Sequence, residues 1–172
     1  MKELAKFDDQ NYQNINNKIK RISIRGVIFI GDKLVMVQTK RSNELLFPGG
    51  GIESGETHSD TLIREVREET GYQVIPETIK ELGYITEIRK SIYDEHELYE
   101  GVSYYYYCKV NEECKTEPQY SLDELKAGYH VVFIKPEVAY LENDKVIKEI
   151  GPRSTWIMRE NFILDILIKN KC

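Results

Sequence analysis

The apolar positions of this 172-residue chain change their period along the sequence, and each change predicts an element of structure. From Lys20 to Ile30 the chain first alternates and then becomes continuously apolar, which is typical of a strand that enters a core. A tight turn at Gly31-Asp32 separates this strand from a returning strand over residues 34–38. The polar, asparagine-rich segment up to about Asn17 is predicted to be either a loose arm or a short strand.

The second half of the chain adds further strands and a final helix. Strands are predicted at 72–74, 79–92, 102–110 and 129–134, and the polar residues 111–127 are predicted as a loop. Pro136 suits the first turn of a short helix, and residues 155–169 are predicted to form an amphipathic helix. No internal repeat or linker interrupts this order. The pattern favours one domain over residues 1–172, with the α/β fold of an α/β/α sandwich around a mixed sheet and two main helices.

The first of these helices is predicted between Thr57 and Gly71. Thr57 is a good N-cap, and Asp60 three residues later completes a capping-box pair. Gly71 suits the left-handed position that ends a helix. The apolar arc that faces the core consists of Leu62, Ile63 and Val66.

Three glutamates of this helix, Glu65, Glu68 and Glu69, share a narrow arc beside the apolar one. Like charges at this spacing repel by about a few tenths of a kcal/mol per pair, so the cluster brings no structural gain. A hard divalent cation held by oxygen ligands explains it. Arg64 can pair with Glu68 and hold its rotamer, and the glycine run 49–51 lets backbone approach an ion or phosphate closely. The alternative interpretation is a solvated acidic face with ordinary caps.

The spacing of these residues resembles the signature of the Nudix hydrolases (MutT-like), G-x5-E-x7-R-E-U-x-E-E-x-G-U, where U is a bulky apolar residue. The fixed positions are met by Gly50, Glu56, Arg64, Glu65, Glu68, Glu69 and Gly71. Tyr72 stands where an aliphatic residue is usual. For this Nudix box, residues 50–72, the resemblance implies hydrolysis of a diphosphate linkage with Mg²⁺ as the cofactor and Mn²⁺ as a substitute.

The resemblance also implies the residues that do the chemistry. It implies Glu65, Glu68 and Glu69 with the Gly49 carbonyl as metal ligands, and Glu65, Glu68 and Arg64 as catalytic residues. One glutamate takes the proton of the attacking water, although some family members use an acid outside the box. Asp123 and Glu124 are candidates for that acid, with a turn and helix cap as the alternative. Glu56 is expected to fix the loop rather than bind metal, and Glu53 could do either.

Composition narrows the class of partner. The net charge of −5 and pI of about 5.4 argue against nucleic acid. Three cysteines without a C-x-x-C pair suggest neither a disulfide framework nor a zinc site, and no apolar run approaches membrane-spanning length. From these features we expect a cytoplasmic protein with no nucleic-acid or membrane partner. The resemblance implies a small-molecule nucleotide or diphosphate substrate, and a homodimer is left open.

Markers of several Nudix substrate classes are missing. The NADH-type signature S-Q-P-W-P-F-P-x-S is absent, and Glu87 stands where ADP-ribose enzymes carry proline. Tyr84 and Tyr93 miss the tyrosine position of the dinucleoside-polyphosphate type, and the spacing before Phe47 is too short for the coenzyme A type. A nucleoside triphosphate or another diphosphate derivative remains. The rival interpretation is a non-catalytic nucleotide-binding Nudix domain acting as a sensor, which commonly lacks box glutamates that this chain has.

Other chemistry-bearing residues have a structural interpretation that is at least as good. Of the run Tyr104–Tyr107, one pair could stack on a base, but packing between sheet and helix is favoured. The basic residues that could reach phosphates are Arg21, Arg25, Lys40 and Arg41. The histidines, His58, His96 and His130, show no ligand spacing, and Trp156 is expected in the core or an interface.

Overall fold

The computed structural model describes residues 1–91, 94, 96–151 and 155–170. Its main sheet has five strands in the order β1-β8-β9-β2-β6. These strands are β1 (Glu3–Asp8), β8 (Lys80–Lys90), β9 (Glu97–Tyr107), β2 (Asn17–Val27) and β6 (Gly49–Gly51). β1 runs parallel to β8 and β2 parallel to β9, while the other neighbours are antiparallel. The predicted mixed sheet is therefore confirmed.

Two smaller sheets extend this arrangement. One has the order β11-β4-β3, with β11 at His130–Ile134, β4 at Lys33–Gln38 and β3 at Phe29–Ile30, and β5 (Leu45–Leu46) pairs with β4. The predicted turn at Gly31-Asp32 joins β3 to β4, and Gly31 has the positive φ of 61° that such a turn requires. The other pairs β7 (Tyr72–Val74) with β10 (Val110–Lys115).

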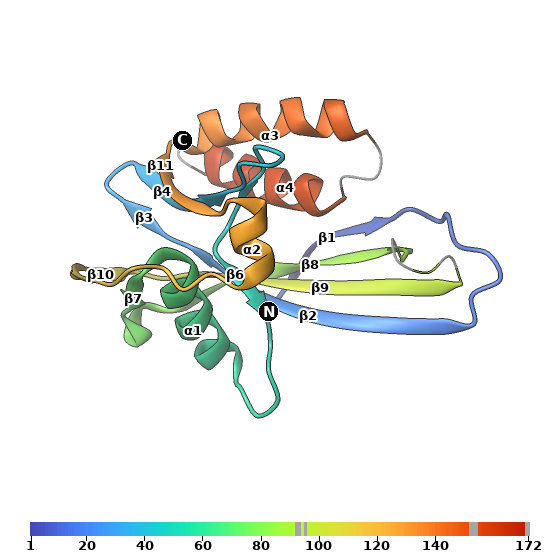
Figure 1. Cartoon of the computed structure of the whole chain (residues 1–172), viewed down its shortest axis with the longest axis horizontal. Helices are drawn as coiled ribbons and strands as arrows, with labels where there is room; N and C mark the ends of the chain where they lie inside the picture. The colour runs from blue at the N-terminus through green and yellow to red at the C-terminus, as the bar shows by residue number, and fades with distance from the viewer. Residues whose placement is uncertain (92–93, 95, 152–154, 171–172) are drawn as a thin grey trace.

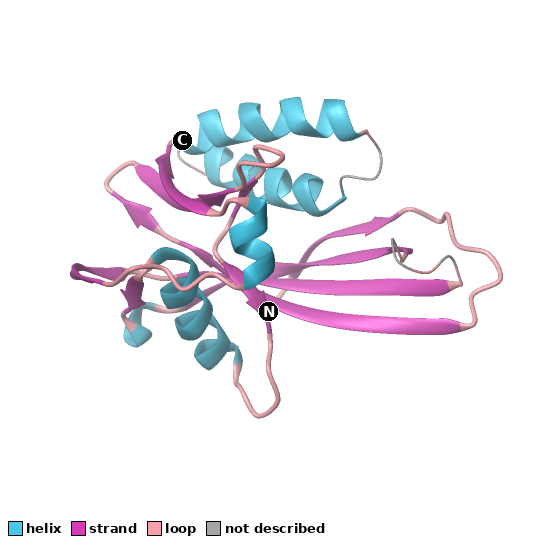
Figure 2. Cartoon of the chain, in the orientation of Figure 1, coloured by secondary structure: helices cyan, strands magenta, loops and turns pink. Residues whose placement is uncertain are grey.

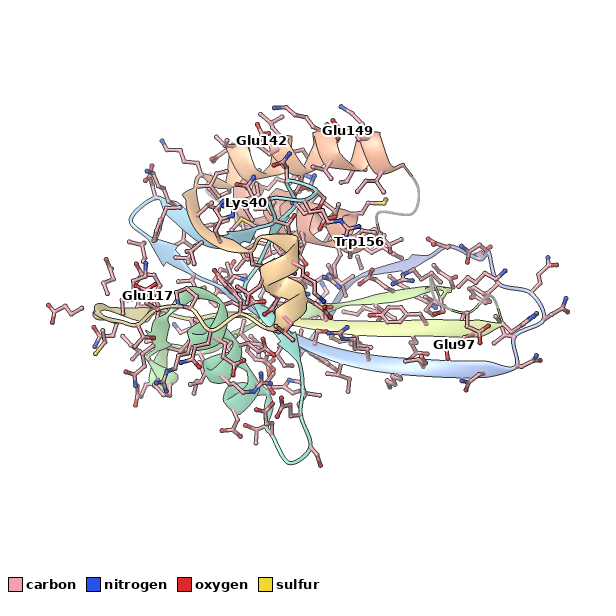
Figure 3. The ribbon with its side chains drawn as sticks, viewed as in Figure 1. Lys40, Glu97, Glu117, Glu142, Glu149 and Trp156 are labelled. Atoms are coloured by element: carbon pink, nitrogen blue, oxygen red, sulfur yellow. The ribbon has the colours of Figure 1, made fainter. Side chains whose placement is uncertain are left out.

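Helices cover both faces of the main sheet (Figures 1 and 2). Helix α1 (His58–Thr70) lies on one side, and α3 (Pro136–Ile150) and α4 (Thr155–Lys169) pack against each other on the opposite side. Each face has its own apolar cluster, which includes Leu62 and Val66 of α1 on one side and Ile163 and Leu164 of α4 on the other. The outer side of α3 carries polar side chains such as Glu142 and Glu149 (Figure 3).

The tyrosine run on β9 serves both cores. Tyr105 and Tyr107 join the cluster on the α4 side, whereas Tyr104 and Tyr106 join the cluster on the α1 side. This alternation is the period-two pattern expected of a strand. The packing interpretation of these tyrosines is confirmed.

Several predicted boundaries were wrong. The strand expected at 102–110 starts earlier, at Glu97, and ends at Tyr107, where the chain leaves β9 to pair with β7 instead. The loop expected at 111–127 contains most of β10 and a short helix, α2 (Leu122–Ala127). β10 was missed because its side chains beyond Val110 are exposed, so no apolar alternation marks the strand. α2 was missed because it is short and none of its residues is buried.

The N-terminal and C-terminal elements also refine the prediction. The arm before Asn17 contains the strand β1, one of the two alternatives expected there. The helix that begins at Pro136 was expected to be short but has 15 residues, which makes it a third main helix. Ile92, the expected end of a strand, lies outside the described residues. In the part of the chain that is described, no helix is long and apolar enough to cross a membrane.

Candidate active site

The ends of α1 are built by local sequence. The Thr57 side chain accepts a hydrogen bond from the backbone N–H of Asp60 at 3.2 Å, and the Asp60 carboxylate accepts one from the N–H of Thr57 at 2.9 Å. Gly71 ends the helix with a φ of 76°, and a side chain there would overlap the Thr116 carbonyl. The predicted capping box and left-handed end are thus present, and they set where α1 begins and ends.

The glycine run packs directly against the acidic face of α1. Gly49 has a φ of 146°, and a Cβ there would overlap the Ile24 carbonyl. Its N–H donates to Glu69 Oε2 at 2.8 Å. A Cβ on Gly50 would lie 2.6 Å from the carboxyl carbon of Glu65. Gly50 is therefore required by the close approach of backbone to the Glu65 carboxylate, and Gly49 by its positive φ and by the backbone of β2. Gly49 also contributes its N–H, in addition to the carbonyl expected from the sequence.

Arg64 connects the acidic groups of the box. Its Nε and Nη2 donate to the two oxygens of Glu56 at 2.6 and 2.9 Å, a bidentate pair. Its Nη1 donates to Glu65 Oε1 at 2.7 Å and to Glu68 Oε2 at 3.3 Å. The expected pairing of Arg64 with Glu68 is present, but the shortest contacts go to Glu56 and Glu65.

Glu56 holds the loop that precedes α1. Its Oε2 also accepts from the Thr61 hydroxyl at 2.8 Å and from the N–H of Glu53 at 3.0 Å. The Arg64 guanidinium, followed by the N–H of Glu53, lowers the pKa of Glu56 to about 2. All of these contacts tie Glu56 to the loop and to Arg64.

Glu69 and Glu65 are buried carboxylates with raised pKa values. Burial raises the pKa of Glu69 to about 8, although the N–H of Gly49 and the charge of Arg25 act in the opposite direction. Burial also raises the pKa of Glu65, against the lowering effect of Arg64. Glu124 contributes negative charge to both sites. An added cation would relieve this repulsion and the burial cost.

The acid outside the box is distinguished by the structure. The segment before α2 is bound to α1, because the N–H of Gln119 donates to the Glu68 carbonyl at 2.7 Å and that of Thr116 donates to the Gly71 carbonyl at 2.9 Å. This brings Glu124 within electrostatic reach of Glu65 and Glu69. Asp123, by contrast, has a side chain 94% exposed and pairs with Lys126 at 3.1 Å. Of these two acids, Glu124 is therefore the one whose charge acts on Glu65 and Glu69.

Two tyrosines that the sequence analysis did not select flank Glu124. Tyr120 and Tyr129 are in edge-to-face contact, with ring centroids 6.1 Å apart. Burial, together with the charges of Glu69 and Glu124, raises the pKa of each phenol to about 12. Their hydroxyls therefore stay protonated at neutral pH next to the carboxylates. No local pattern marks them, because they reach the site only through the placement of α2.

A cleft of about 410 Å³ opens beside the acidic face. It is lined by Asp60, Ile63, Arg64, Arg67, Glu68 and Gln119. This volume lies within the range of small-molecule sites. Arg64 and Arg67 give the cleft cationic groups that suit phosphate oxygens.

The oxygen donors of the box suit a hard cation, but the glutamate side chains do not converge on one point. Among the described residues no three His, Cys, Asp or Glu side chains form a metal-holding group. The reason is visible in the contacts: Glu65 and Glu68 turn toward Arg64, and Glu69 turns toward Gly49. The donors are anionic oxygens, and burial makes two of them costly to ionise alone, which is the chemistry that favours Mg²⁺.

The remaining residues singled out from the sequence are placed as follows. Arg25 donates to the Phe47 carbonyl at 2.9 Å, next to the glycine run. The side chain of Lys40 packs beside Gly128, just beyond α2 (Figure 3). His58 Nδ1 lies 2.7 Å from the Tyr106 hydroxyl. The Arg21 side chain passes Gly51, and the backbone N–H of Arg41 donates to the Ala127 carbonyl. His96 is exposed, and His130 contacts the Gly128 carbonyl. Trp156 is half-buried on α4 (Figure 3).

Comparison with known proteins agrees with this geometry. The family model described as the NUDIX domain matches residues 20–150, most of the chain. The chain belongs to the Nudix family. It is 43% identical over 54 residues to an uncharacterized Nudix hydrolase, YvcI, of Bacillus subtilis, and 35% identical over 75 residues to a probable DHNTP pyrophosphohydrolase of Lactococcus lactis. These matches cover 31% and 42% of this chain, and 34% and 45% of the two relatives, so less than half of either relative is matched.

The fold agrees as well. A NUDIX hydrolase structure from Nitrosomonas europaea superposes with a TM-score of 0.54 and 16% identity, covering 84% of this chain and 88% of that one. The predicted family and fold class are therefore confirmed.

Proposed function

We propose that this protein is a metal-dependent pyrophosphohydrolase that cleaves a nucleoside triphosphate, or a small nucleoside diphosphate derivative, by attack of water on phosphorus. The observation that carries the proposal is that the Glu65 carboxylate lies against Gly50, the Glu69 carboxylate accepts from the N–H of Gly49, and the charge of Glu124 acts on both carboxyls. These carboxylates come from two different helices, so a simple acidic helix face does not account for them. The cleft that contains Arg64 and Arg67 lies beside them.

Glu65, Glu68, Glu69 and Gly49 would hold Mg²⁺, with Mn²⁺ as a substitute. The ion, when bound, neutralises charge on the phosphoryl oxygens and lowers the pKa of water. Arg64 orients Glu65 and Glu68 through the contacts described above and is itself fixed by Glu56. Arg67, exposed at the cleft, is placed to contact a phosphate.

Glu124 is the base that the placement of α2 favours. A base must lie close to the water whose proton it takes; the charge of Glu124 acts on Glu65 and Glu69, whereas the Asp123 side chain is in solvent. Glu124 also caps α2, because its Oε2 accepts from the N–H of Ser121 at 2.7 Å. The two interpretations that the sequence left open, base and cap, are thus compatible in one residue. Glu65 or Glu68 is the other candidate base.

One of the two relatives informs the choice of substrates to test. The Lactococcus protein is named as a probable DHNTP pyrophosphohydrolase. DHNTP therefore belongs in the panel beside the common nucleoside triphosphates. A cytoplasmic location, a homodimer and the lack of a nucleic-acid partner stay predictions from composition.

The test is hydrolysis of a nucleotide panel with Mg²⁺, with both products identified, for the wild type, Glu124→Gln and Asp123→Asn. Glutamine is an accepted capping-box residue, so Glu124→Gln removes the charge and keeps the cap. We expect a loss of about 10²- to 10⁴-fold in kcat for Glu124→Gln and wild-type rates for Asp123→Asn. Binding of nucleotides without any turnover by the wild type would favour the sensor interpretation instead.

A further inference from the structure

A buried charged cluster joins α4 to the main sheet, away from the Nudix box. Arg159 and Glu160 on α4 are 5% and 0% exposed, and Glu87 on β8 is 2% exposed. Arg159 Nη1 donates to Glu87 Oε2 at 2.5 Å and to the Ser103 hydroxyl at 2.9 Å. Its Nη2 donates to Glu160 Oε1 at 2.8 Å. Arg159 thus has two buried carboxylate partners.

Of these two carboxylates, Glu160 reaches the loop that leads into the box. Its Oε2 accepts from the backbone N–H of Phe47 at 3.1 Å, and its Oε1 accepts from the Tyr105 hydroxyl at 3.1 Å. The ring of Tyr105 also makes an edge-to-face contact with the ring of Phe47, with centroids 5.8 Å apart. Phe47 is therefore fixed through both its backbone and its side chain.

Arg25 holds the other side of the same residue. Its Nη1 donates to the Phe47 carbonyl at 2.9 Å, and its Nε lies 3.5 Å from Glu160 Oε1. The ion pair of Arg25 and Glu160 therefore binds both backbone polar groups of Phe47. Two residues further along, the N–H of Gly49 donates to Glu69 Oε2. The chain of contacts runs from α4 through Phe47 to a proposed metal ligand.

This placement is more specific than stability requires. A buried ion pair adds little stability over apolar residues of the same volume, so its presence calls for a reason in register or position. Arg159 already has a buried partner in Glu87. The distinctive contact of Glu160 is the one with Phe47. Glu160 also lies beyond residues 20–150, the part of the chain that the NUDIX domain model matches.

We propose that Glu160 and Arg25 are positioning residues that set the place of Gly49, and through it the orientation of the Glu69 carboxylate. This inference rests on the proposed function insofar as Glu69 is taken as a metal ligand. Neither residue needs to touch substrate. If the contacts of Glu160 and Arg25 with Phe47 are lost, the glycine run can shift. This shift weakens metal binding more than substrate binding.

The experiment compares Glu160→Gln with Glu87→Gln. Each variant removes one charge from a buried carboxylate partner of Arg159, but only Glu160 contacts the box loop. For both we would measure kcat, KM and the Mg²⁺ concentration for half-maximal activity, at a temperature where circular dichroism shows both folded. Removal of a group that orients a ligand typically costs about 10- to 100-fold in metal affinity or activity, which is the expected change for Glu160→Gln. Glu87→Gln is expected to lower the melting temperature and leave the Mg²⁺ requirement unchanged.

Amide hydrogen exchange supplies a readout that does not depend on activity. Glu160→Asp keeps the charge but shortens the reach to Phe47, and is the alternative if Glu160→Gln does not fold. We expect faster exchange at the N–H groups of Phe47 and Gly49 in Glu160→Gln or Glu160→Asp, and unchanged exchange there in Glu87→Gln. If the wild type hydrolyses nothing, the proposed function fails while these exchange rates still decide the positioning role.

Two results would overturn the inference. One is an equal shift of the Mg²⁺ requirement in the Glu160 and Glu87 variants, which would make the cluster purely structural. The other is unchanged exchange at Phe47 and Gly49 in a folded Glu160 variant.

Discussion

The raised pKa of Glu69 makes a prediction about stability that needs no knowledge of the substrate. Its carboxyl has a pKa of about 8 in the folded protein against an ordinary value of 4.5, mainly because it is buried. In Glu69→Gln the ionisable group is lost, while the side-chain carbonyl can still accept the N–H of Gly49. The variant therefore isolates the cost of burying this one acid without metal.

The direction in which stability changes with pH follows from the pKa values of Glu69 in the folded and the unfolded protein. Below about pH 4.5 the carboxyl is protonated in both states, and the wild type has its full stability. As the pH rises from 4.5 to 8, the unfolded chain releases the proton and the folded protein retains it, so stability falls. Each pH unit in this window costs up to about 1.4 kcal/mol. By pH 7.5 the loss amounts to roughly 4 kcal/mol.

The assay is urea unfolding in EDTA at several pH values between 5 and 8, for the wild type, Glu69→Gln and Asp123→Asn. Groups shared by the proteins cancel in the difference, so the wild type should lose stability relative to Glu69→Gln as the pH rises. Asp123→Asn is the control, because its side chain is 94% exposed and it should follow the wild type. Parallel pH curves for the wild type and Glu69→Gln would refute the assignment of a buried, proton-retaining carboxyl.

A bound metal ion offsets the cost of burying the ionised Glu69 carboxylate. A cation that binds only the folded state adds about RT ln(1 + [L]/Kd), roughly 2.7 kcal/mol at a hundredfold excess over Kd. Mg²⁺ and Mn²⁺ should therefore raise the melting temperature of the wild type above that in NaCl of matched ionic strength. Glu69→Gln should show a smaller shift. Identical shifts in all three salts would mean that no specific metal site exists.

Three further predictions test the chemistry directly. Glu68→Gln should remove nearly all hydrolysis while circular dichroism shows an intact fold, and near-normal turnover at saturating Mg²⁺ would contradict its role as a ligand. Gly50→Ala should lower activity at least tenfold because its Cβ displaces the Glu65 carboxylate, whereas Gly51→Ala, whose Cβ would have no neighbour closer than 3.9 Å, should keep it. A nucleoside triphosphate or small nucleoside diphosphate derivative should have a higher kcat/KM than ADP-ribose, NADH or coenzyme A; the opposite order would overturn the argument from missing markers.

The parts of the site that the sequence predicted are those whose contacts are local. Thr57, Asp60 and Gly71 define α1 through hydrogen bonds that span at most four residues. The arc of Glu65, Glu68 and Glu69 follows from the helical period alone. The mixed sheet was predicted because its long strands carry apolar patterns: β2 becomes almost continuously buried toward its end, and β8 keeps a period of two. β10 was missed because it is held by pairing with β7 and not by burial.

The rest of the candidate site depends on long-range contacts, which no periodic pattern in the sequence predicts. Glu160 lies 113 positions from Phe47, inside a helix whose pattern shows only that one side is apolar. Glu124 and Asp123 are adjacent and chemically alike, yet the charge of Glu124 acts on Glu69, whereas the Asp123 side chain is 94% exposed and pairs with Lys126. The box supplies the carboxylates, whereas the residues that we propose as base and as positioning residue, Glu124 and Glu160, lie on α2 and α4, elsewhere in the chain. Substitutions at Glu124 and Glu160 should therefore be as informative about the reaction as those within the box.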